Sequence, residues 1–178
     1  MSTPSSGSGL KTFTAVIAVI FGLVLLIGGI YLAVLGGSWY YIIAGLLFIA
    51  TAVLLQKLKS TALIVYALLV LGTVVWGLWE VGSDFFALAP RLDILGLFGL
   101  WLLIPAVTRG FDNAKGAKIA LTGSLAITIA VMIYAVFNDP QEIRGELSSK
   151  QPATAQSIPG VADGDWPAYG RTQSGLRY

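Results

Sequence analysis

Five long apolar runs dominate this sequence and limit the folds that are open to it. They cover residues 13–35, 39–56, 62–79, 92–108 and 117–137. Each run is close to the roughly 20 residues that an α-helix needs to cross the hydrocarbon core of a bilayer. None shows the alternation of apolar and polar residues that is typical of membrane barrel strands. The runs therefore predict an all-α membrane protein that forms a bundle of five transmembrane helices.

Composition supports a lipid bilayer as the surroundings and excludes several kinds of chemistry. Of the 178 residues, 56% are hydrophobic and 11% are charged, whereas soluble domains usually carry about 25% charged residues. The chain has no histidine and no cysteine, so it cannot supply imidazole or thiolate ligands to haem, nor a Ser-His-Asp or Cys-His centre. The net charge of +2 is too small to indicate a nucleic-acid partner.

Charged residues between the runs indicate an orientation. If the N-terminus is cytoplasmic, the cytoplasmic segments hold nearly all the bases of the membrane region, and their only acid is Asp112. In the outer loops the only base is Arg91, an asymmetry that follows the positive-inside rule. An odd number of spans then places the segment after residue 137 in the periplasm. The cytoplasmic bases are Lys11, Lys57, Lys59, Arg109, Lys115 and Lys118, and the outer acids are Glu80, Asp84, Asp93, Asp139, Glu142, Glu146, Asp163 and Asp165.

Aromatic residues gather at the predicted outer ends of the runs. They fit an interfacial belt, in which amphipathic rings lie at the level of the lipid headgroups. They also fit a belt on which another domain docks, because aromatic side chains are enriched at protein interfaces. Both interpretations stay open. The residues are Trp39, Tyr40, Tyr41, Trp76, Trp79, Phe85, Phe86, Tyr134 and Phe137.

The loop over residues 79–93 holds the candidate binding residues. Trp79, Arg91 and Asp93 offer an aromatic face, a donor and a carboxyl group, which is what a quinone ring needs. A structural interpretation competes with this one: Asp93 lies in the first turn of the fourth helix, and Arg91 extends toward the headgroups. Pro90 suits a first turn, and Pro105 predicts a local kink.

Small residues at four-residue spacing predict close helix contacts. Ala18 and Gly22 provide such a spacing in the first run, and small side chains let helix backbones approach each other within a membrane. The fifth run has a longer series. It consists of Gly116, Ala120, Ser124 and Thr128.

The segment after the last run differs in composition. Residues 138–162 are polar and rich in Pro, Ser, Ala and Gly, which is typical of a linker. Aromatic residues return in 163–178, in a stretch that looks like the first strand and turn of a β domain. We therefore expect a cytoplasmic tail over 1–12, a membrane anchor over 13–137, a periplasmic linker over 138–162 and the start of a truncated domain over 163–178.

Four stretches carry a resemblance to a known family. They are GGSWYYIIAGL (36–46), VWGLWEVGSDFFALAPRLDIL (75–95), FNDPQEIRGEL (137–147) and DWPAYGRTQSGLRY (165–178). Together they resemble the N-terminal part of the membrane-bound PQQ-dependent dehydrogenases of the glucose/quinate/shikimate group. In that family a five-helix anchor in the inner membrane precedes a periplasmic β-propeller, which holds PQQ and a calcium ion.

The resemblance implies a function for this chain. Members of the family oxidise aldose sugars, typically D-glucose to glucono-1,5-lactone, and pass the electrons to ubiquinone. None of the family's cofactor-binding or catalytic residues falls within 1–178, so this chain is expected to anchor the enzyme and to be inactive alone. A separate small membrane subunit that docks a polyol or quinate/shikimate dehydrogenase is the alternative. A transporter or channel is disfavoured because intramembrane charges are nearly absent.

Overall fold

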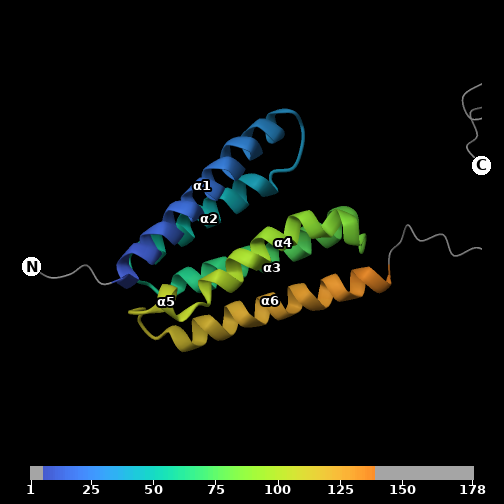
Figure 1. The fold of residues 1–178 in the computed structure, drawn as a ribbon. Coiled ribbons are helices and arrows are strands. Elements are labelled where there is room, and N and C mark those ends of the chain that lie inside the picture. Colours follow the sequence, from blue (N-terminus) through green and yellow to red (C-terminus); the bar gives the residue numbers. More distant parts are fainter. Residues whose placement is uncertain (1–5, 139–178) are drawn as a thin grey trace, which may run out of the picture. The chain divides into compact units, whose positions relative to one another are not determined.

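The computed structural model describes residues 6–138, which belong to one compact unit of the chain. This part of the chain is all-helical, with no strand. The linker predicted over 138–162 and the start of a truncated domain predicted over 163–178 therefore lie almost wholly outside the described residues. The helices are α1 (Ser6–Val34), α2 (Tyr40–Gln56), α3 (Thr61–Val81), α4 (Phe85–Leu102), α5 (Pro105–Thr108) and α6 (Ala114–Phe137) (Figure 1).

Helices α1 and α2 form an antiparallel hairpin, which Figure 1 shows above α3, α4 and α6. The chain reverses after α1 at Gly36, whose φ of +81° lies in the left-handed region that favours glycine. Glycines also set the spacing of the two helices. A Cβ built on Gly22 would lie 3.0 Å from the Gly45 carbonyl oxygen, and one built on Gly45 would lie 2.7 Å from the Gly22 carbonyl oxygen. The expected close contact at Gly22 is therefore confirmed, because only glycine allows this separation.

An aromatic cluster joins the two parts of the bundle. Phe48 of α2, Tyr66 of α3 and Phe98 of α4 lie with ring centroids 5.4–5.8 Å apart, and Phe21 of α1 lies 6.2 Å from Phe98. The one polar atom of this group is satisfied, because the Tyr66 hydroxyl donates to the Leu95 carbonyl at 2.7 Å. Aromatic rings from four helices thus pack against one another in the core of the bundle.

The helices are long and apolar enough for a membrane protein, but the structure supports fewer spans than the sequence predicted. Within the described residues, four helices could cross a bilayer by length and composition: α1, α3, α4 and α6. Helix α2 is apolar but has only 17 residues. Five crossings and their orientation are therefore not established by the fold.

Helix α4 differs most from its predicted position. We expected a helix over 92–108, but α4 begins at Phe85 and ends at Leu102. It begins early because the Asp84 carboxylate accepts a hydrogen bond from the Ala87 N–H at 3.1 Å and caps the helix. Asp93 consequently lies in the third turn rather than the first, and Pro90 lies inside the helix.

The expected kink at Pro105 is a complete break. Ile104 has an extended conformation, with φ −58° and ψ 129°, and α5 restarts with Pro105 at its first position. A proline disfavours the helical conformation of the residue before it and suits the first turn of a new helix. The prediction of one continuous fourth helix was therefore wrong.

Candidate binding site at the aromatic end of the bundle

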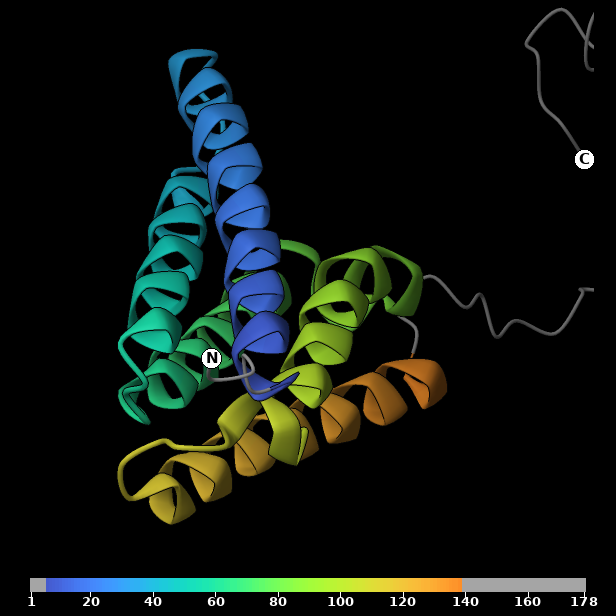
Figure 2. The same ribbon diagram turned by 60° about the vertical axis from the view of Figure 1, so that its left-hand side comes forward.

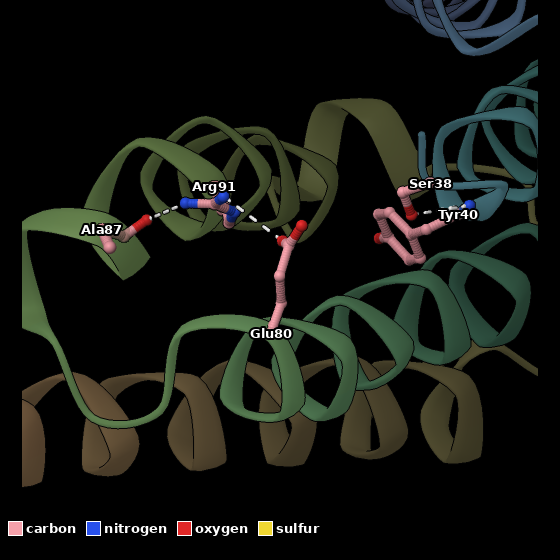
Figure 3. A network of polar contacts seen from close by, with 5 residues as sticks. All are labelled: Ser38, Tyr40, Glu80, Ala87 and Arg91. Atoms are coloured by element: carbon pink, nitrogen blue, oxygen red, sulfur yellow. Dashed lines mark hydrogen bonds and ion pairs between the residues drawn. The ribbon is translucent and has the colours of Figure 1, made fainter. Parts of the chain in front are cut away.

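Arg91 makes the densest set of polar contacts at one end of the bundle (Figure 3). Its Nη2 lies 3.3 Å from the Glu80 carboxylate of α3. Its Nη1 donates to the Ala87 carbonyl of the preceding turn. The guanidinium carbon lies 5.5 Å from the centroid of the Trp76 ring, within the range of a cation–π contact. Arg91 thus fastens the start of α4 to the end of α3.

The hydrogen bond to Ala87 keeps the Arg91 side chain along its own helix. Pro90 lacks an N–H, so the carbonyl that loses its helical donor at this turn is that of Phe86, four residues earlier. The Ala87 carbonyl lies four residues before Arg91 and accepts from the Arg91 side chain. This contact directs the guanidinium back toward the first turn of α4.

Aromatic rings from α2 extend this cluster. Tyr40 stacks on Trp76 with centroids 4.1 Å apart and planes 7° from parallel. Tyr41 meets the edge of the same ring at 5.3 Å. The Tyr40 hydroxyl is hydrogen-bonded to the Thr73 hydroxyl, and Thr73 gives its own proton to the Leu69 carbonyl at 2.7 Å. Tyr40 is therefore the donor to Thr73, and its oxygen keeps lone pairs for a further hydrogen bond.

These residues border a cavity of about 500 Å³. It reaches from Arg91 and Trp76 to Phe21 and Phe48 in the aromatic cluster, and its lining is overwhelmingly apolar. Arg91 is the one charged residue of this lining, and its Nε is buried without a hydrogen-bond partner among the described residues. Small-molecule sites are typically apolar cavities of roughly 300–1,000 Å³ with a few polar groups that fix the ligand. The cavity has the size and lining of such a site.

The structure separates the three residues that the sequence grouped as quinone candidates. Only Arg91 lines this cavity. Trp79 is 83% exposed, and Asp93 lines a different, apolar groove between α4 and α6. Arg91 and Asp93 are two residues apart on a helix of 3.6 residues per turn, so their side chains leave opposite faces.

Sequence reasoning missed the residues that accompany Arg91. Thr73, Trp76 and Glu80 recur at i, i+3 and i+7, the spacing of one helix face. That pattern places Trp76, and not Trp79, on the same helix face as Glu80, and so favours Trp76 as a partner of Arg91. Tyr40 gave no such signal beyond its place among the aromatic residues, because its contact with α3 depends on helix packing. Residues 6–138 contain no cluster of three His, Cys, Asp or Glu side chains that would suit a metal ion.

The apolar helices and the aromatic cavity define a helical membrane region, and comparisons with known proteins identify its relatives. The chain is 62% identical over 178 residues to quinoprotein glucose dehydrogenase A of Acinetobacter calcoaceticus, which covers 100% of this chain and 22% of that protein. It is 52% identical over 170 residues to quinoprotein glucose dehydrogenase of Escherichia coli (strain K12). That match covers 95% of this chain and 21% of the relative. The chain belongs to the quinoprotein glucose dehydrogenase family, of which it corresponds to the N-terminal part.

The comparisons also show a separate-subunit relative. The glycerol dehydrogenase small subunit of Gluconobacter thailandicus is 37% identical over 103 residues, which covers 56% of this chain and 81% of that protein. A probable quinate dehydrogenase and a quinate/shikimate dehydrogenase match as well. No family model and no solved structure matches the chain. The predicted family is confirmed, and the chain spans only 22% and 21% of the length of the two glucose dehydrogenases.

Proposed function

We propose that this chain is the membrane anchor of a quinoprotein glucose dehydrogenase, which oxidises D-glucose to glucono-1,5-lactone in the periplasm and reduces ubiquinone. The observation that carries the proposal is the match of the whole chain to the N-terminal fifth of such enzymes, combined with helices that are long and apolar enough to cross a membrane. PQQ and calcium would bind in the part of the enzyme beyond the N-terminal fifth that this chain matches.

We propose further that α2 also crosses the inner membrane, which gives five spans with the N-terminus in the cytoplasm. Its 17 residues extend about 25 Å, a few ångströms less than the hydrocarbon core. Interfacial anchors can make up such a mismatch. Trp39, which is 69% exposed, precedes α2, and Lys57 follows it. An aromatic residue at the outer end of a span and a base at its inner end fit the proposed orientation.

The cavity beside Arg91 is the proposed site for the ubiquinone ring. The Arg91 guanidinium, the one charged group of the lining, would donate to a quinone carbonyl, and the Tyr40 oxygen would accept from the hydroxyl of the reduced ring. The Arg91–Glu80 pair has no net charge, so the site favours a neutral ligand over an anion. Trp79 and Asp93 do not border this cavity, and we assign Trp79 to the interfacial belt.

A chimeric enzyme tests the anchor proposal. Residues 1–178 replace the matching region of the Escherichia coli relative, in cells that lack their own enzyme, and a version without any N-terminal region is the control. We expect the chimera in the membrane fraction, with glucose-dependent ubiquinone reduction that needs PQQ and calcium. Recovery of the chimera in the soluble fraction would contradict the anchor role.

The quinone site has its own test in the same chimera. Arg91→Gln removes the charged guanidinium donors, and losing a hydrogen bond from a charged donor costs roughly 1.5–3 kcal/mol, about tenfold or more in affinity. We expect the KM for a ubiquinone analogue to rise about tenfold, with unchanged glucose oxidation by a water-soluble acceptor. Asp93→Asn is the matched control and should leave both unchanged. If the two substitutions raised the KM for the ubiquinone analogue equally, the cavity would not be the quinone site.

The separate-subunit alternative rests on the glycerol dehydrogenase small subunit, whose length the chain covers to 81%. In that case the chain would dock a dehydrogenase made as another polypeptide. The match to this subunit covers 56% of the chain, whereas the glucose dehydrogenase match covers 100%. Sequencing the gene beyond the codon for Tyr178 decides between them: an open frame with propeller repeats supports the anchor, and a stop codon supports the subunit.

A further inference from the structure

The hairpin of α1 and α2 diverges from α3 and α4 toward the aromatic end of the bundle, and Figure 2 shows the start of α1 beside the end of α4. At this other end the elements are tied together. The Asp112 carboxylate accepts a hydrogen bond from the Ser60 N–H at 2.9 Å, which lowers the pKa of that carboxyl and joins the turn after α2 to the turn before α6. The Trp101 Nε1 of α4 donates to the Thr14 hydroxyl of α1 at 3.0 Å. The cavity beside Arg91 therefore lies where the helices diverge.

The side of the cavity between α1 and α4 is open. Phe21 of α1 and Phe98 of α4 lie with ring centroids 6.2 Å apart and close the cavity toward the tied end. About one turn closer to the aromatic end on each helix, Val24 and Ile94 line the cavity, yet they are 64% and 52% exposed. Side chains that line a cavity and are also exposed mark its mouth. We call Val24 and Ile94 the mouth residues.

The walls contributed by α2 and α3 are closed by comparison. Ala44, Phe48 and Thr73 line the same cavity and are buried. Helices α1 and α4 are both long and apolar enough to cross a bilayer, and Ile94 lies midway along α4. An opening between these two helices at that level therefore faces the hydrocarbon of the bilayer rather than water.

The polar groups of the cavity lie away from the mouth. Arg91 lines the wall one turn closer to the aromatic end of α4 than Ile94, and the Tyr40 hydroxyl is held by Thr73 of α3. The mouth residues and their neighbour Leu95 are apolar. The cavity thus suits a molecule with a polar head and an apolar tail, because the head can meet Arg91 while the tail stays in lipid.

We propose that the cavity opens sideways into the bilayer and takes a quinone with a long apolar tail, which passes over Val24 and Ile94 into the lipid. This inference rests on the proposed quinone site beside Arg91 and adds the route into it and the class of quinone that it prefers. The mouth residues touch the tail and not the ring, so they select for a membrane quinone over a water-soluble one.

Quinones with and without a tail test this assignment in the chimeric enzyme. The preference is the ratio of kcat/KM for decylubiquinone to kcat/KM for the same ring without a tail. Val24→Ala and Ile94→Ala each remove apolar surface from the mouth, and losing the burial of one CH2 group costs about fourfold in affinity. We expect each substitution to lower the preference about fourfold through decylubiquinone alone, with unchanged glucose oxidation by a water-soluble acceptor.

The matched controls are Leu23→Ala on α1 and Leu97→Ala on α4. Both leucines are exposed, at 44% and 68%, and neither lines this cavity, so their loss removes similar apolar surface from the same helices. Unchanged preference in both controls supports a defined mouth. Controls that lower the preference as much as Ile94→Ala would overturn the proposal, because the tail would then report only partition into the bilayer.

Two further outcomes separate this inference from the quinone site itself. If Ile94→Ala lowered kcat/KM equally for both quinones while Arg91→Gln still raised the KM, the cavity would hold the ring but the tail would not leave past Ile94. If Arg91→Gln had no effect on either quinone, the quinone site and the mouth would both be refuted.

Photolabelling gives a readout that does not depend on turnover. A decylubiquinone analogue with a diazirine on its tail is activated by light in the reconstituted chimera, and the labelled residues are found by mass spectrometry. We expect labels in the segments around Val24 and Ile94. Labels confined to α3, or to the groove between α4 and α6, would overturn the proposed mouth.

Discussion

The spacing of α1 and α2 depends on Gly45, and replacing it with alanine should separate the hairpin. A Cβ at this position would lie 2.7 Å from the Gly22 carbonyl oxygen and 2.7 Å from the Leu26 nitrogen. Ordinary van der Waals contact begins at 3.4 Å, so the two helices must move apart by about 0.7 Å, the difference between 3.4 and 2.7 Å. Both obstructing atoms are backbone atoms, which no rotamer change can move aside.

The expected cost is that of overpacking, about 1–3 kcal/mol. Alanine also favours a helix interior over glycine by roughly 0.5–1 kcal/mol, which partly offsets the clash. Gly28→Ala corrects for this effect. Gly28 lies in α1 with nothing within 4 Å of its Cβ position, so its substitution has the propensity gain without the clash. The difference between the two variants should therefore be close to the full overpacking cost.

Unfolding of each variant by sodium dodecyl sulfate in mixed micelles, followed by circular dichroism, measures this difference in free energy. We expect Gly45→Ala to unfold at a lower mole fraction of the detergent than the unsubstituted chain, and Gly28→Ala at an equal or higher one. If Gly45→Ala were as stable as Gly28→Ala, the close approach of α1 and α2 would be refuted.

Three further substitutions test local features by the same unfolding assay. Asp84→Ala should lose about 1 kcal/mol with the cap of α4, and Asp84→Asn should retain most of it, because Asn caps as well as Asp; equal losses would argue against capping. Tyr66→Phe should lower the free energy of unfolding by about 1 kcal/mol, because it leaves the Leu95 carbonyl without its donor. An unchanged stability would mean that this hydrogen bond does not stabilise the core. Folding lowers the pKa of Asp112, so its carboxylate stabilises the fold above its ordinary pKa of about 4 and loses this effect as the pH falls through the lower folded value. The stability advantage over Asp112→Asn should accordingly be present at neutral pH and vanish in acid, and an advantage that grew in acid would contradict the Ser60 contact.

The bounds of a helix were predicted well where the apolar run is flanked by residues that clearly end it. The runs over 39–56 and 117–137 became Tyr40–Gln56 and Ala114–Phe137, because lysines, glycines or the sequence Asn-Asp-Pro flank them. The start of α4 escaped prediction because its first turns hold a cap, a proline and an arginine that read as a loop. Whether the chain breaks or bends at Pro105 depends on local backbone geometry that hydropathy does not report.

The candidate site was predicted in part for a similar reason. Arg91 stood out as the lone base in the outer loops, and the structure places it on a cavity wall. Trp76 and Trp79 end the same run, and only the rotation of α3 decides that Trp76 faces α2 and α4. The contribution of Tyr40 required the packing of α2 on α3, which no local pattern encodes.

The membrane topology tests the central claim most directly. Alkaline phosphatase, which is active only in the periplasm, and β-galactosidase, which is active only in the cytoplasm, are each fused after Tyr178 and expressed in bacterial cells. An anchor with five crossings and a cytoplasmic N-terminus predicts high phosphatase and low galactosidase activity. High galactosidase activity with an inactive phosphatase would mean that the chain after the last span lies in the cytoplasm, and would contradict the proposal that this chain holds a sugar-oxidising domain in the periplasm.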